Sequence, residues 1–473
     1  MKKLRKNIMR ISLVLMSLFF VLAAYGAYTI SINGNRWFSS TVNEYAREKR
    51  SDVIPGGILD RNGVVLASAD EAGKRSYPAA ENVRRATVHA VGSSAFNMKS
   101  SAEYFFASYL YGFNLTLPER LGYVFSGQKY HGDNVQLTID SALSAYVAQI
   151  FPSDKRGAVL VMNYRTGEVL TEQSFPSFDP ADTAAAPAGS SINRCTQSLK
   201  APGSTFKMVT AACAIENYAD YQTRVFRCDG LLQLGSRTVI DAGTDLSAGK
   251  ITKHGSVTLE KAFQVSCNNT FASIALEIGD QKLRATAEKF GFNDNFLFRD
   301  IVVENSSYPL TNRTDAEIAW TGAGQSALAV SPLHMCLIAS SIANGGVMME
   351  PRTLIAVTAQ SGARRMSFSE KVYRRPLTAA QAEILKGYMR GVVTGGTGTA
   401  AAVSGVKVCG KTGSAEIDTQ ENTNAWFVGF LDESASPYSL VVVVEDAGGG
   451  GSVAAPIARQ IFQWLIKNAS AAK

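Results

Sequence analysis

The sequence predicts an α/β (α+β) protein in which an antiparallel sheet is flanked by helices, preceded by a membrane anchor and a small support domain. Residues 406–415, 424–430 and 438–444 alternate or cluster like strands, and short links join them, so they should pair antiparallel. Residues 206–216 and 379–393 have the apolar spacing of helices. A length of 473 residues suggests two or three domains.

The N-terminal end combines a basic flank with a long apolar run. Residues 1–10 carry five Lys or Arg and no acid, and residues 11–32 are uncharged and mostly apolar. As a helix this run would span the roughly 30 Å of a bilayer core. The positive flank predicts a cytoplasmic N-terminus and, in a single-pass protein, an extracellular remainder. A cleaved signal peptide is the alternative, because residues 23–27 are mostly small.

The charge and the cysteines exclude some functions. The basic flank contributes +5 of the net +7, which leaves +2 for the rest and gives no reason to expect nucleic-acid binding. The cysteines show no CxxC and no zinc-type histidine spacing, so we expect no metal and no cofactor. Disulfides are possible outside the cell, and the spacing favours no pairing. The six are Cys195, Cys213, Cys228, Cys267, Cys336 and Cys409.

The chain beyond the anchor divides into two regions. Residues 33–135 contain Asn62-Gly63 between β-rich runs, which predicts a hairpin, and they show no obvious chemistry, so we expect a support domain. Residues 136–473 hold the remaining motifs and form the larger domain. It should open with a helix after Asp140 and a strand–turn–strand unit within 157–171.

The chemical signal with the clearest context is Ser204-Thr205-Phe206-Lys207. Pro202 and Gly203 precede it and a long apolar helix follows, so Ser204 should lie near the start of that helix. Lys207 is three residues on, which places the two side chains on one face with Cβ atoms roughly 5–6 Å apart. A lysine can activate a serine nucleophile if it is neutral, and burial or a second cation favours that form.

Two further motifs follow in order, Ser266-Cys267-Asn268 and Lys411-Thr412-Gly413. Each motif is weak alone, since Ser-x-x-Lys and Ser-x-Asn also occur elsewhere in the chain. Together, in this order and in these contexts, they match a known signature of serine acyl-transfer enzymes that react with β-lactams.

With these motifs in place, the chain resembles a class B penicillin-binding protein of the compact Gram-positive type, a membrane-anchored D,D-transpeptidase of peptidoglycan synthesis. Residues 55–63, 157–180, 322–325, 411–416 and 425–430 resemble other segments of that family. The resemblance implies that residues 136–473 are a transpeptidase domain with the fold shared by serine β-lactamases. It also implies acylation by β-lactams, which imitate D-Ala-D-Ala.

The resemblance assigns roles to eight residues. Ser204 would attack the penultimate D-Ala carbonyl, Lys207 would be its base, and Ser266 would relay a proton to the leaving amine. The remaining residues would orient or bind the stem peptide. Asn268 would orient both the peptide amide and Lys207, and Lys411 would supply positive charge that attracts the terminal carboxylate. The hydroxyls of Thr412 and Ser414 would bind that carboxylate, and Gly413 would permit close approach of the substrate.

The resemblance also predicts binding partners, and two alternative functions remain open. The resemblance implies peptidoglycan stem peptides as substrate and a SEDS-family glycan polymerase as partner, contacted through the anchor and the support domain. One alternative is a hydrolase on the same fold, either a D,D-carboxypeptidase or a β-lactamase. The other is a catalytically silent scaffold or sensor that binds β-lactams, although a silent site would not need Ser204, Lys207, Asn268 and Lys411 intact.

Overall fold

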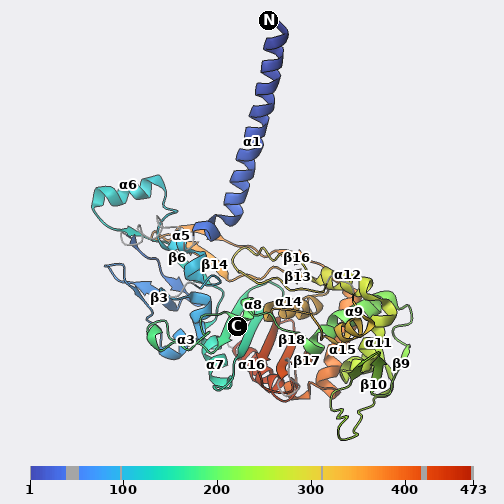
Figure 1. Cartoon of the computed structure of the whole chain (residues 1–473). Coiled ribbons are helices and arrows are strands. Elements are labelled where there is room, and N and C mark those ends of the chain that lie inside the picture. Colours follow the sequence, from blue (N-terminus) through green and yellow to red (C-terminus); the bar gives the residue numbers. More distant parts are fainter. Residues whose placement is uncertain (1, 39–52, 96–97, 310–312, 417–422, 470–473) are drawn as a thin grey trace.

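The computed structural model describes most of the chain, namely residues 2–38, 53–95, 98–309, 313–416 and 423–469. Figure 1 shows a body of sheets and helices from which one long helix, α1 (Lys2–Phe38), projects. The most apolar 18-residue window within its segment Lys3–Thr29 has a mean hydropathy of 2.1, and none of that window is buried. At about 1.5 Å per residue the segment is long enough to cross a bilayer, and within the described ranges α1 is the one helix that is. The predicted apolar run 11–32 therefore lies inside a helix suited to membrane anchoring.

The centre of the body is a five-stranded antiparallel sheet in the order β17-β18-β19-β7-β8 (Figure 1). Its strands are Val408–Glu416 (β17), Thr423–Leu431 (β18), Tyr438–Val444 (β19), Gly157–Asn163 (β7) and Val169–Phe175 (β8). The three late strands and their antiparallel pairing are confirmed, as is the early strand–turn–strand unit. Because β17 pairs only with β18, the sheet ends in an open edge there.

Alternate residues of these strands face two apolar cores, as the two-residue repeat of a strand requires. Val441 and Val443 of β19 face one core, whereas Val442 and Val444 face the other. Helices α7 (Ser141–Ile150) and α16 (Ala454–Ala469) pack on the second core. The valine run of β19 is thus explained by burial on both faces.

Helices that carry or support the three motifs lie on the other side of the sheet. They are α8 (Arg194–Gln197), α9 (Lys207–Asn217), α10 (Leu259–Gln264), α11 (Asn268–Ile278), α12 (Asp280–Phe290), α13 (Asp315–Ala323), α14 (Pro332–Ala343) and α15 (Ala379–Gly395). Short 3₁₀ turns occur at Thr183–Ala185, Gly203–Phe206 and Thr399–Ala401. The helices predicted near 206–216 and 379–393 are confirmed as α9 and α15.

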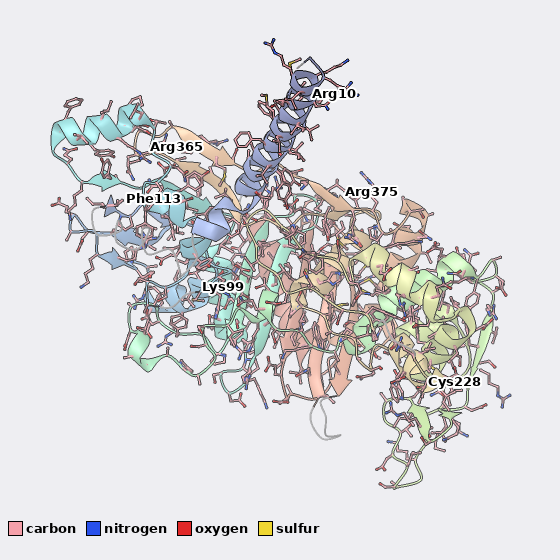
Figure 2. All side chains as sticks on the ribbon, turned by 45° about the horizontal axis from the view of Figure 1, so that its top comes forward. Arg10, Lys99, Phe113, Cys228, Arg365 and Arg375 are labelled. Atoms are coloured by element: carbon pink, nitrogen blue, oxygen red, sulfur yellow. The ribbon has the colours of Figure 1, made fainter. Side chains whose placement is uncertain are left out.

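Two small strand pairs extend from this helical layer. They are β9 (Val225–Cys228) with β12 (Gly255–Thr258), and β10 (Leu231–Leu234) with β11 (Arg237–Ile240), each antiparallel. Figure 2 places Cys228, at the end of β9, at the opposite end of the molecule from Arg10 of α1.

A second, six-stranded sheet lies at the end nearer α1, in the order β15-β14-β6-β2-β3-β4. Its strands are Arg364–Ser367, Leu354–Thr358, Asn134–Leu137, Ile58–Leu59, Val65–Ala69 and Arg75–Ser76. Around it lie α3 (Glu81–Val91), α4 (Ala102–Phe105), α5 (Ala107–Leu110), α6 (Leu117–Ser126) and the pairs β1 (Val53–Ile54) with β5 (Tyr130–His131) and β13 (Met348–Met349) with β16 (Val372–Arg374).

The Asn62-Gly63 hairpin is confirmed as the turn between β2 and β3. Asp60 holds it, because its Oδ1 accepts from the backbone N–H groups of Asn62 and Val64, each at 2.8 Å. Strands β14 and β15 come from residues 354–367, and the expected boundary at 135/136 falls within β6. The support region and the larger domain therefore share one sheet.

Candidate active site

Ser204 lies in a tight turn that leads directly into α9. The turn is the 3₁₀ segment Gly203–Phe206, and α9 begins at Lys207. Gly203 has a φ of 55°, and a Cβ there would lie 2.8 Å from the carbonyl oxygen of Ser414, so this position requires glycine. This close approach brings the start of the helix against β17.

Lys207 is fully buried, and its amino group contacts four oxygen atoms. Its Nζ lies 3.0 Å from Ser204 Oγ, 2.8 Å from the carbonyl oxygen of Ser266, 3.3 Å from Ser266 Oγ and 2.6 Å from Asn268 Oδ1. The Asn268 amide has a defined orientation, because its Nδ2 donates to the carbonyl oxygen of Ile240 at 2.8 Å.

These contacts direct the lone pair of a neutral Lys207. The carbonyl oxygen of Ser266 and Oδ1 of Asn268 only accept, so they take the two N–H groups of the neutral amine. The lone pair is then left for a hydroxyl, and Ser204 Oγ is the nearer of the two. Burial lowers the pKa of Lys207 from 10.5 to about 8, against opposing contributions from Cys267 and Asp241. A neutral amine that can accept the Ser204 proton is therefore accessible near neutral pH.

Lys411 is also fully buried and reaches the same hydroxyl from β17. Its Nζ donates to Ser266 Oγ at 2.9 Å and to the carbonyl oxygen of Thr412 at 3.0 Å. Burial, and then the positive charge of Lys207, lower the pKa of Lys411 well below its ordinary value. In the described part of the chain the lysine ion pairs involve Lys200, Lys289, Lys371 and Lys386, so neither Lys207 nor Lys411 has an acid within ion-pair distance. Ser266, which has an uncommon φ of 60°, thus bridges two lysine amines that have no carboxylate partner.

The open edge of β17 carries the remaining predicted residues. Thr412 Oγ1 lies 2.5 Å from Thr397 Oγ1, and Ser414 Oγ accepts from the backbone N–H of Gly450 at 3.3 Å. Gly413 lies between them, where a Cβ would come within 3.0 Å of neighbouring atoms of the Ser204 turn. Two hydroxyls on the open strand edge, beside the buried Lys411 amine, are suited to a carboxylate.

A cleft of about 520 Å³ joins these groups. Ser204, Ser266, Asn268, Thr412 and Ser414 line it, with the two lysines buried beneath. Sequence reasoning did not single out several other lining residues, which are Asp241, Trp320, Gln325, Thr397 and residues 449–452. The glycines around Thr397 and at 448–451 were a signal that the backbone approaches something closely there.

A serine held against a buried lysine, with a second lysine and an open strand edge beside it, defines a serine acyl-transfer site. The family comparison agrees with this class. The model of the penicillin-binding protein transpeptidase domain matches residues 157–463, and the chain belongs to this family, as a class B member. The sequence-based resemblance is therefore confirmed, together with the fold that it implied.

Individual relatives agree in sequence and in structure. The chain is 29% identical to the peptidoglycan D,D-transpeptidase PbpA of Mycolicibacterium smegmatis over 383 residues, which covers 74% of this chain and 76% of PbpA. A D,D-transpeptidase domain from Eggerthella lenta is 30% identical, with a TM-score of 0.75, over 87% of this chain and 98% of that one. The penicillin G acyl-enzyme of penicillin-binding protein A from Mycobacterium tuberculosis is 26% identical, with a TM-score of 0.76, over 87% and 99%.

Proposed function

We propose that this protein is a peptidoglycan D,D-transpeptidase that cross-links stem peptides through an ester on Ser204, and that β-lactams acylate the same serine. The contact between Ser204 Oγ and the buried Lys207 Nζ at 3.0 Å carries this proposal. The PbpA relative is named as a peptidoglycan D,D-transpeptidase, and a structural relative is a penicillin G acyl-enzyme, which supports it.

In the acylation step, Ser204 Oγ attacks the carbonyl carbon of the penultimate D-Ala while Lys207 Nζ takes its proton. The negative charge that develops on the carbonyl oxygen is stabilised by the backbone N–H groups of Ser204 and Ser414. The helix start and the edge strand that supply them are held together by the close approach at Gly203.

The tetrahedral intermediate then loses D-Ala. Ser266 Oγ lies within 3.3 Å of both lysine amines, so it passes the proton from Lys207 to the leaving nitrogen. An amine of a second stem peptide enters the vacated position, attacks the Ser204 ester and gives its proton back along the same route. The new amide bond forms as the ester bond breaks, and Ser204 is regenerated.

The open edge of β17 binds the substrate. A bound terminal carboxylate favours the protonated form of Lys411, which then gives the cleft a positive potential, and the hydroxyls of Thr412 and Ser414 donate to that carboxylate. Asn268 orients the peptide amide through its Nδ2 and orients Lys207 through its Oδ1. Gly413 lets the substrate backbone approach the strand.

We further propose the topology expected from the sequence. Residues 1–10 lie in the cytoplasm, residues 11–32 cross the membrane, residues 33–135 form the support domain, and the transpeptidase domain 136–473 lies outside the cell. A SEDS-family polymerase contacts the anchor and the support domain. The exposed apolar side chains Val124 and Phe125 of α6, at the end of the body that carries α1, suit such a contact. Loss of co-purification with the polymerase in Phe125→Ser would support it.

The function is tested with the full-length protein in detergent and a fluorescent penicillin. Wild type should retain one label for hours, whereas Ser204→Ala should take up none. Rapid release of hydrolysed drug would indicate a β-lactamase, and no label in either protein would indicate a silent scaffold. Release of D-Ala from a stem pentapeptide, measured with and without an acceptor amine, separates transpeptidation from carboxypeptidation.

A further inference from the structure

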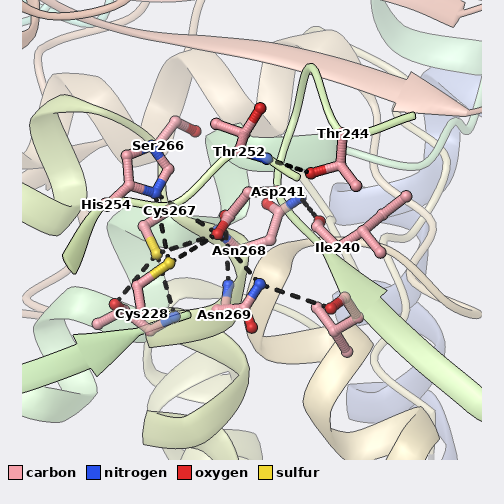
Figure 3. A network of polar contacts seen from close by, with 12 residues as sticks. Cys228, Ile240, Asp241, Thr244, Thr252, His254, Ser266, Cys267, Asn268 and Asn269 are labelled. Carbon is pink, nitrogen blue, oxygen red and sulfur yellow. Dashed lines mark hydrogen bonds and ion pairs between the residues drawn. The ribbon is translucent and has the colours of Figure 1, made fainter. Parts of the chain in front are cut away.

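Four side chains from separate segments converge behind the Ser266-Cys267-Asn268 motif (Figure 3). Cys228 ends β9, Asp241 follows β11, His254 precedes β12, and Cys267 lies between α10 and α11. Their thiol, carboxylate and imidazole atoms all lie within 4.8 Å of one another. Three of the four residues are buried, and the His254 side chain is 19% exposed.

Three of four separations between these atoms match the edges of a tetrahedron around one ion, and the fourth, from Cys228 Sγ to Asp241 Oδ2, is a short thiol hydrogen bond that a shared ion would replace and lengthen. Cys228 Sγ lies 2.9 Å from Asp241 Oδ2 and 3.5 Å from His254 Nδ1. Asp241 Oδ2 lies 3.5 Å from His254 Nδ1 and 3.6 Å from Cys267 Sγ. A zinc ion with usual bond lengths and tetrahedral angles would place sulfur about 3.5 Å from nitrogen or oxygen, and nitrogen about 3.3 Å from oxygen.

We propose that Cys228, Asp241, His254 and Cys267 bind one Zn²⁺ ion. Two sulfurs, one imidazole and one carboxylate favour a tetrahedral, thiophilic cation, whereas Mg²⁺ and Ca²⁺ prefer six or more oxygen ligands. Four protein ligands fill the tetrahedron, so the ion is structural. The sequence led us to expect no metal site, because successive ligands are 13 residues apart and form no recognisable zinc spacing.

Only one of the two carboxylate oxygens of Asp241 is used to cap a helix. Its Oδ1 accepts from the backbone N–H groups of Asn268 and Asn269 at the start of α11, which is ordinary capping. Its Oδ2 instead faces both thiols and the imidazole, and it accepts from Asn269 Nδ2 at 3.0 Å. Ligating carboxylates are commonly held in this way by hydrogen bonds behind the ligand atom.

The charge balance is compatible with the buried position. Binding forms two metal–thiolate bonds and one bond each to the imidazole and the carboxylate, and the two thiol protons leave to solvent. A dication therefore replaces two protons, and the net charge of the cluster stays at that of the Asp241 carboxylate. Thr270 is placed to stabilise the thiolate of Cys267, because its N–H and its Oγ1 donate to Sγ at 3.3 Å and 3.1 Å.

The ion would hold the second motif of the active site in place. Cys267 lies between Ser266, which bridges the two lysines, and Asn268, which accepts from Lys207. Ser266 has the left-handed φ of 60°, a conformation that surrounding structure must impose on a non-glycine residue. The four ligands are thus positioning residues, and this effect on acylation rests on the proposed function, whereas zinc binding itself does not.

Metal binding is measured on the full-length protein, stripped with a chelator under reducing conditions and then given Zn²⁺ or Co²⁺. We expect one zinc per chain by mass spectrometry and a thiolate-to-cobalt charge-transfer band. Cys228→Ser and His254→Ala should each weaken zinc affinity by more than about 100-fold, because even residues behind a ligand are worth 10–100-fold. Cys213→Ser, which changes a buried thiol outside the cluster, and Ser204→Ala should keep one zinc.

Three outcomes would overturn the zinc site. These are a reduced wild type that takes up no zinc, full retention of zinc in both ligand variants, and a native protein with four titratable thiols in place of six, which would indicate a Cys228–Cys267 disulfide.

The coupling to the active site has its own test. Chelation of the wild type should slow acylation by a fluorescent penicillin about tenfold, and Zn²⁺ should restore it, with circular dichroism unchanged. An unchanged acylation rate in protein shown to be zinc-free would refute the coupling and leave the metal site standing. If neither form is acylated, the proposed function fails while the zinc measurement stands.

Discussion

The pH dependence of acylation tests whether Lys207 is the base. With its pKa lowered from 10.5 to about 8, about one tenth of the chains carry a neutral amine at pH 7. Without that shift the neutral fraction would be roughly 0.03%, so burial increases the reactive form about 300-fold, equivalent to about 3.4 kcal/mol. Because a base must be deprotonated to act, the acylation rate should rise about tenfold per pH unit at low pH. It should level off above about pH 8.

The assay is the second-order rate of labelling by a fluorescent penicillin between about pH 6 and pH 9.5. Lys207→Ala should label about 10²–10⁴-fold more slowly and lose the rise with pH. Lys129→Ala, which removes an exposed lysine of the support region, serves as the matched control. A wild-type rate that is flat across this range, or a normal rate in Lys207→Ala, would refute the assignment.

Three further substitutions test neighbouring parts of the site, and a fourth, Gly345→Ala, is the control for the first of them. Gly324→Ala should lower the free energy of unfolding by on the order of 3 kcal/mol, because the φ is 97° and a Cβ would lie 1.8 Å from the Gly203 carbonyl oxygen. Gly345→Ala, with a φ of 62° and open space around it, should cost only about 1 kcal/mol, and both free energies are measured by urea titration. Asn268→Asp puts a carboxylate against the Lys207 amine, so the labelling profile should move to higher pH, and an unmoved profile would contradict the geometry. Thr397→Val should reduce the second-order labelling rate about tenfold, because one hydroxyl of the cleft loses its partner, and the folding midpoint should stay near that of wild type.

The sequence alone determined the elements whose signals are local. The valine run of β19 and the Asn62-Gly63 turn depend on neighbouring residues in the chain, so residue type predicted them correctly. The apolar run 11–32 was likewise sufficient to predict a long apolar helix. The three motifs were recognisable because their order along the chain is informative in itself, and the family they indicated is confirmed.

Tertiary structure decided every property that depends on distance between segments. The pKa of Lys207 is lowered by burial against the effects of Cys267 and Asp241. The lysine amine also contacts four oxygen atoms, three of which come from residues about 60 positions later. The second sheet takes strands from both regions, which no division of the linear chain could indicate. Cys228 and Cys267 had no pattern in sequence, because the proposed metal site depends on where side chains meet in space, and four separate segments bring Cys228, Asp241, His254 and Cys267 together.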